Sequence, residues 1–133
     1  MTGVQTCALR SWPRPAGYAN GVAARGRLIF TAGQIGWNGS GIFETDDFTE
    51  QTRQALKNIV AVLAAAGARP EHITSMTWYV VSKAEYLANL KGVGAVWREM
   101  IGKHYCAMAA VEVVSLMEDR ARIEIQAIAV VPD

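Results

Sequence analysis

The carboxylate of Glu124 is a side chain in this sequence that could perform general acid–base chemistry. Glu124 stands in the segment RIEIQ near the end of the chain, where alternating side chains indicate a β-strand. A carboxylate there can orient a water molecule, take a proton from it and return a proton to a leaving group. The alternative is a structural role, in which Glu124 pairs with Arg120, Arg122 or a cation of a neighbouring subunit. Glu112 is a second candidate carboxylate, for which structural pairing is the simpler interpretation.

The cysteines and histidines predict no metal or redox centre. Cys7 and Cys106 lack the CxxC spacing, and His72 and His104 lie outside any HExxH pattern. Alternation would place His104 and Cys106 on the same side of an extended segment, but nothing in the sequence predicts the lowered thiol pKa of a reactive cysteine. P-loop, GxGxxG and GxSxG motifs are absent from the sequence. We therefore expect chemistry without a metal or cofactor.

The size and charge of the chain predict one globular domain. Its 133 residues, 51% hydrophobic and 19% charged, can build a core of their own. The net charge of +1 argues against non-specific nucleic-acid binding, because that requires a basic surface. No apolar run is long enough for a membrane span, and the first residues lack the order of a signal peptide. We expect a cytoplasmic protein without nucleic-acid or membrane partners.

Residues 1–15 differ from the rest of the chain. They contain Pro13 and Pro15, show no sustained periodicity and carry the isolated Cys7, which is typical of a disordered leader. The run MTGVQTCAL is also similar to translated sequencing-adapter fragments, so a non-native leader is the second interpretation. The expected single domain covers residues 16–133.

Hydrophobic periodicity divides this domain into strands and helices. The expected strands are Tyr18–Ala23, Leu28–Ile35, Ile73–Val81, Ala107–Val114 and Ala121–Val131, with the first two forming a β-hairpin. Helices are expected over Phe48–Ala66, capped by Asp46 or Asp47 and ended by Gly67, and over Lys83–Gly102, capped by Ser82 and weakened by Gly92 and Gly94. The order ββαβαββ predicts an α/β (α+β) fold, with one mixed sheet and both helices on one face.

The last strand predicts that the second face of the sheet is covered as well. One side of this strand is aliphatic, with Ile123, Ile125, Ala127 and Ala129. The other side mixes charged, amide and aliphatic residues, namely Arg122, Glu124, Gln126, Ile128 and Val130. Such a mixture fits the interface of a closed oligomer better than a bare surface or a monomer core.

Several segments of the chain resemble one known family. They are RGRLIFTAGQIGWN, QTRQALKNIVAVLAAAGA, HITSMTWYVV and RIEIQAIAVVPD. Together they are similar to the RidA (YjgF/YER057c/UK114) family over roughly Tyr18 to Pro132. The resemblance implies a chorismate-mutase-like homotrimer with ligand clefts between subunits. It also implies metabolite damage control, in which reactive enamines and imines such as 2-aminoacrylate are hydrolysed to keto acids and ammonia without a cofactor.

The resemblance assigns roles to individual residues. Tyr18 matches a tyrosine that lines the family cleft, Gly33 and Gln34 match residues whose backbone borders the ligand, and Glu124 matches a glutamate that positions or activates water. Met108 marks a departure, because it stands where the deaminase branch has an arginine that grips the substrate carboxylate. A thioether offers no hydrogen-bond donor to a carboxylate, but it can pack against an apolar or conjugated substrate.

Three functions follow from these observations as expectations. The first is a hydrolytic deaminase of small enamines or imines, for which 2-iminoacids and the conjugated 2-aminomuconate are conceivable substrates. The second is a non-enzymatic trimer that binds or senses a small metabolite, favoured by Met108 and opposed by Glu124. The third is an endoribonuclease, opposed by the near-neutral charge.

Overall fold

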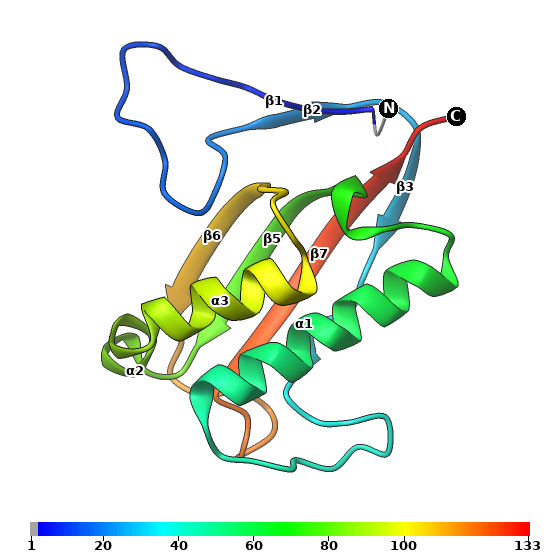
Figure 1. The fold of residues 1–133 in the computed structure, drawn as a ribbon. Helices are drawn as coiled ribbons and strands as arrows, with labels where there is room; N and C mark the ends of the chain where they lie inside the picture. Colours follow the sequence, from blue (N-terminus) through cyan, green and yellow to red (C-terminus); the bar gives the residue numbers. More distant parts are fainter. Residues whose placement is uncertain (1–2) are drawn as a thin grey trace.

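The computed structural model describes residues 3–133 and shows a main five-stranded sheet with helices on one of its faces (Figure 1). The sheet contains β3 (Arg27–Phe30), β7 (Ile123–Val131), β5 (Ile73–Val80) and β6 (Ala107–Glu112) in that spatial order, and β4 (Gln34–Ile35) also pairs with β7. β5 and β6 are parallel, whereas β7 is antiparallel to β3, β4 and β5. The predicted mixed sheet is therefore confirmed.

The helices are α1 (Phe48–Ala65), α2 (Lys83–Ala88) and α3 (Leu90–Met100), with a short 3-10 helix, η1 (Pro70–His72), before β5. They cover one face of the sheet, as predicted (Figure 1). Asp47 caps α1 by accepting a hydrogen bond of 3.0 Å from the Glu50 backbone N–H. In the same way, the Ser82 hydroxyl caps α2 by accepting a hydrogen bond from the Glu85 backbone N–H. None of the helices within residues 3–133 combines the length and apolar character needed to cross a membrane.

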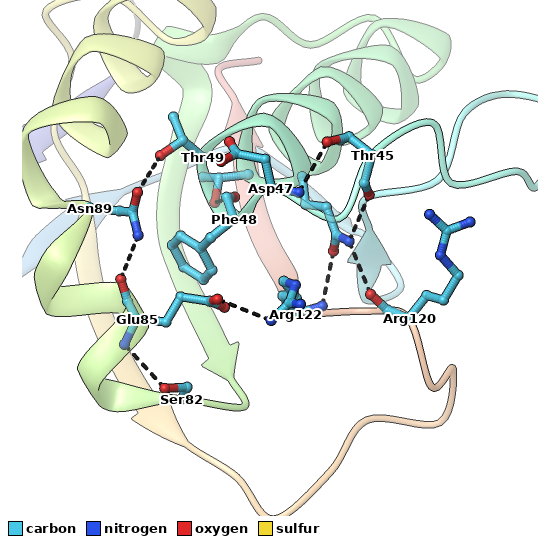
Figure 2. Close-up of polar contacts among 11 residues, drawn as sticks. Thr45, Asp47, Phe48, Thr49, Ser82, Glu85, Asn89, Arg120 and Arg122 are labelled. Carbon is cyan, nitrogen blue, oxygen red and sulfur yellow. Dashed lines mark hydrogen bonds and ion pairs between the residues drawn. The ribbon is translucent and has the colours of Figure 1, made fainter.

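The second predicted helix is divided at Asn89, not at its glycines. The Asn89 side chain donates to the Glu85 carbonyl and accepts from the Thr49 hydroxyl of α1 (Figure 2). Gly92 allows α3 to approach α1 closely, since a Cβ there would lie 3.0 Å from Thr49 Oγ1. Leu87 of α2 and Leu90 of α3, on either side of this break, are exposed by 50% and 48%. The buried positions are Val93, Val96, Trp97 and Ile101.

The predicted hairpin of the first two strands is wrong. β2 (Val22–Ala24) pairs with β1 (Val4–Thr6) in a separate two-stranded sheet, while β3 pairs with β7. The positive φ of Gly26 turns the chain between β2 and β3, so that the two strands enter different sheets. Within the leader that the sequence predicts to be disordered, residues 1–15, the structure places a strand over Val4–Thr6. That this segment is non-native stays a prediction.

The alternation predicted for the last strand is confirmed. Ile123, Ile125, Ala127 and Ala129 of β7 are at most 1% exposed and pack under the helices. On the opposite side, Glu124 and Ile128 are partly exposed and Gln126 is exposed. β7 therefore separates an apolar, helix-covered face from a mixed face, which we call the open face of the sheet.

The fully buried side chain of Gln51 joins α1 to the beginning of β7. Its amide nitrogen donates to the carbonyls of Thr45 and Arg120, and its oxygen accepts from the Arg122 backbone N–H at 2.9 Å (the partners are labelled in Figure 2). A Cβ on Gly36 would lie 2.7 Å from the Gln51 Cβ, so the backbone of residue 36 packs directly against it. This amide fixes the strand immediately before Glu124.

Replacement of Gln51 by alanine should lower the free energy of unfolding by about 2–4 kcal/mol, because it leaves buried backbone groups without partners. Urea unfolding followed by circular dichroism measures the change. Gln54→Ala is the matched control, since Gln54 lies on the same helix and, within residues 3–133, its amide forms a hydrogen bond only with the Asn58 side chain. Equal decreases in the free energy of unfolding of the two variants would contradict the role assigned to Gln51.

Candidate functional site

The Glu124 carboxylate lies on the open face of the sheet, near the beginning of β7. Glu124 is opposite Tyr79 of β5 and Ile35 of β4, so strands border it on both sides. Its side chain is partly exposed. The site therefore consists of a carboxylate on a rigid central strand that is still accessible from outside the chain.

Gly33 packs directly against this carboxylate. A Cβ added to Gly33 would lie 2.6 Å from Glu124 Oε2 and 2.7 Å from its Cδ, closer than any carbon can approach. The φ of Gly33 is not positive, so the requirement for glycine is one of space and not of backbone conformation. Gln34, the next residue, pairs with Ile125, and its side-chain amide donates to the Ala32 carbonyl at 3.4 Å. The structure thus brings Gly33 against Glu124, whereas the Gln34 side chain, opposite Ile125, does not join them and only its backbone lies next to Gly33.

The cations nearest to Glu124 in the sequence are engaged elsewhere. Arg122 pairs with Glu85 at 3.0 Å (Figure 2), and Arg120 pairs with Asp46 at 3.0 Å. Within residues 3–133, the Glu124 carboxylate has neither an ion-pair partner nor a hydrogen-bond donor. Within one chain, the structural alternatives for Glu124 that involve these arginines are therefore excluded, whereas pairing with a cation of a neighbouring subunit stays a prediction.

Tyr79 and Gln126 extend the polar surface beside Glu124. Gln126 is opposite Thr77 of β5, and the Tyr79 hydroxyl donates to Gln126 Oε1 at 3.5 Å. Tyr79 was not identified from the sequence, because the run ITSMTWYVV was interpreted only as a strand buried on at least one face. The signal that could have identified it is the alternation of Thr77 and Tyr79 with the buried Met76 and Trp78.

Tyr18 and Met108 lie away from this cluster. Tyr18 is 41% exposed at the outer edge of β6, where Ala19 forms a bridge to Ala107. Met108 is opposite the buried Met76 in the parallel pair of β5 and β6, so its side chain is on the helix-covered face and packs against the core. Within one chain, the structure places Met108 and Glu124 on opposite faces with β5 between their strands.

Cys106 is not a nucleophile. Its side chain is fully buried, and burial raises the pKa of the thiol to about 12. His104 does not activate it, because Nε2 of the ring lies 2.7 Å from the Ile73 carbonyl oxygen. The possible Cys106–His104 pair is therefore excluded.

Glu112 and His72 have structural roles. Glu112 accepts a hydrogen bond of 2.7 Å from the Lys83 backbone N–H at the beginning of α2, which confirms the structural interpretation of this carboxylate. His72 is buried, not on the surface as its loop position predicts, and its Nδ1 accepts from the Arg69 backbone N–H. No group of metal-ligating side chains forms among the residues that the structure describes.

Comparisons with known proteins place these features in context. A protein-family model described as Endoribonuclease L-PSP matches residues 11–131. A RutC family protein of Pyrococcus horikoshii is 35% identical over 118 residues, which is 88% of this chain and 90% of the relative. A 2-iminobutanoate/2-iminopropanoate deaminase of Escherichia coli is 33% identical over 130 residues, covering 95% of this chain and 97% of the enzyme. The crystal structure of a Rid family protein of unknown function from Yersinia pestis superimposes with a TM-score of 0.85 at 28% identity, covering 97% and 99% of the two chains.

The two thiols should differ sharply in reactivity. Near pH 7, Cys7 is exposed and should react with a disulfide reagent such as DTNB, whereas Cys106 should not, because its raised pKa and burial suppress the thiolate. Both thiols should react with DTNB after denaturation. A Cys7→Ser variant should show no reaction with DTNB in the native state. Rapid native labelling of that variant would contradict the assignment of Cys106.

Proposed function

Because the chain belongs to the RidA (YjgF/YER057c/UK114) family, whose sequence model is described as Endoribonuclease L-PSP, we propose that it is a cofactor-independent deaminase. Its substrates are small, reactive enamines and imines, which it hydrolyses to a carbonyl product and ammonia. The observation that carries this proposal is the Glu124 carboxylate, which is held against Gly33 on the open face of the sheet without a counterion in residues 3–133. The relatives named 2-iminobutanoate/2-iminopropanoate deaminase support the same chemistry.

Glu124 is the general base and acid in this proposal. A proton from solvent on the enamine carbon gives an iminium ion. Glu124 removes a proton from water as the water oxygen bonds to the iminium carbon, and then delivers that proton to the nitrogen of the resulting carbinolamine. The C–N bond breaks as the carbinolamine hydroxyl becomes the carbonyl group and returns its proton to solvent. The products are one carbonyl compound and one ammonia, so no oxidant or cofactor is consumed. The backbone at Gly33 and Gln34 borders the substrate.

A homotrimer completes the site in this proposal. The open face carries apolar side chains that a single chain leaves uncovered, among them Leu28 and Phe30 of β3, exposed by 56% and 66%. Exposed apolar area of this kind favours contact with further copies of the chain. Tyr18, at the outer edge of β6, would then reach the Glu124 cluster of a neighbouring subunit and orient its substrate. The expected setting is the removal of damaged metabolites in the cytoplasm.

A metabolite-binding trimer is the second candidate, and Met108 is the observation that favours it. The thioether provides no charge for a substrate carboxylate, so turnover of simple 2-iminoacids depends on other groups in the cleft. A conjugated compound such as 2-aminomuconate would gain more from contact with Met108. Stabilisation by a ligand without product release would identify a binding protein, and cleavage of RNA that requires Glu124 would identify an endoribonuclease.

Replacement of Glu124 by glutamine should lower kcat for imine hydrolysis by about 10²–10⁴-fold, because the amide cannot accept and return the proton. The assay measures ammonia and keto acid released from enzymatically generated 2-iminobutanoate and from 2-aminomuconate. Glu112→Gln is the matched control, since that carboxylate lies on the helix-covered face and caps α2. Wild-type turnover that persists unchanged in Glu124→Gln would refute the assigned role.

Replacement of Gly33 by alanine should lower kcat for imine hydrolysis about as strongly as Glu124→Gln does, because the added Cβ would displace the Glu124 carboxylate. Stability should change little, since the displaced atoms belong to the end of a side chain and φ is not positive. The control is Gly39→Ala, where a Cβ would meet nothing within 4 Å. If Gly33→Ala retains wild-type kcat, the contact does not position Glu124.

A further inference from the structure

The open face carries a second polar position, two residues beyond Glu124 on β7. Gln126 is exposed there and lies opposite Thr77 of β5, whereas Glu124 lies opposite Tyr79. Two residues of a strand span about 7 Å, and side chains at this spacing point to the same side. A molecule whose reacting carbon lies at Glu124 can therefore reach Gln126 with a group at its far end.

The Tyr79 hydroxyl orients the Gln126 side chain. It donates to Gln126 Oε1 at 3.5 Å, so the amide nitrogen is the end that remains available. Within residues 3–133, neither this nitrogen nor the Thr77 hydroxyl has a hydrogen-bond partner. An amide that accepts through its oxygen presents two N–H donors. The pair of Tyr79 and Gln126 thus offers donors to a ligand on the open face.

The surroundings of Gln126 favour an uncharged acceptor on that ligand. Gln126, Thr77 and Ala109 of β6 form one row across the sheet, and the exposed Ala109 side chain is only a methyl group. The row therefore leaves room above the sheet, and its donors are neutral. A carboxylate placed here would be repelled by Glu124 in the next row, whereas an amide carbonyl gains the hydrogen bonds without that cost.

We propose that Gln126 and Tyr79 determine which imines the protein hydrolyses. They select substrates whose side chain ends in a neutral hydrogen-bond acceptor, such as a carboxamide. Gln126 Nε2 donates to that acceptor, and Tyr79 is a positioning residue that holds the amide. This inference rests on the proposed deaminase function and specifies its substrate class; the bonds that form and break are the same.

The test compares the imines that an L-amino-acid oxidase forms from L-glutamine and from L-methionine. The two side chains are similar in length, but one ends in a carboxamide and the other in an apolar thioether. The ratio of their kcat/KM values isolates the far-end group, because the reacting atoms are the same. The wild type should prefer the glutamine-derived imine by about fivefold, the contribution of one hydrogen bond.

Gln126→Met keeps the size of the side chain and removes its donors. It should lower kcat/KM for the glutamine-derived imine by about fivefold and leave that for the methionine-derived imine within about twofold of wild type. Tyr79→Phe keeps the ring and should lower the preference by about twofold, because the amide is no longer held. Gln54→Met is the matched control, since it makes the same substitution on α1, where the amide donates to Asn58, and it should not change the ratio.

The outcomes separate this inference from the deaminase function. A wild-type ratio near one, or a preference that Gln126→Met leaves unchanged, overturns the role of Gln126 while the deaminase function stands. Hydrolysis of 2-iminobutanoate with neither longer imine accepted also overturns this inference alone. Failure to hydrolyse any of the three imines refutes the proposed function and this inference with it.

Discussion

The burial of alternate residues along β7 is the constraint on which the rest of the structure depends. β7 pairs with β3, β4 and β5, and its four inward aliphatic side chains are at most 1% exposed beneath the helices. A shift of one residue in register would bury Glu124 and expose Ile125. The position of the carboxylate is thus determined by hydrophobic burial on the other side of the strand, and not by bonds that Glu124 makes itself.

The polar network at the beginning of β7 complements this constraint. The Gln51 amide holds the strand at Arg120 and Arg122, and the guanidinium groups of both arginines bind acidic side chains away from the open face. Glu124 is therefore close in sequence to two cations and yet pairs with neither. A carboxylate supported by a rigid strand and left without a counterion in residues 3–133 is suited to exchange protons with a substrate.

Local signals were sufficient to predict some elements and insufficient for others. The beginning of α1 follows from the Asp47 cap, and the burial of β7 follows from its period of two. The pairing of β2 with β1, the break at Asn89 and the face occupied by Met108 depend on contacts between distant segments, which periodicity does not encode. The same holds for the site. The resemblance to a known family identified Glu124, but only the folded chain shows that Gly33 lies against its carboxylate and that Met108 lies on the other face of the sheet.

A crystal structure of the protein with 2-oxobutanoate, the keto acid produced by hydrolysis of 2-iminobutanoate, would show whether Glu124 contacts the reacting carbon's substituents. We expect the keto group to lie beside Gly33 within hydrogen-bond reach of the Glu124 carboxylate, in a cleft on the open face of the sheet. A structure in which Glu124 instead pairs with a cation of a neighbouring subunit, with the keto acid bound elsewhere or excluded, would contradict it.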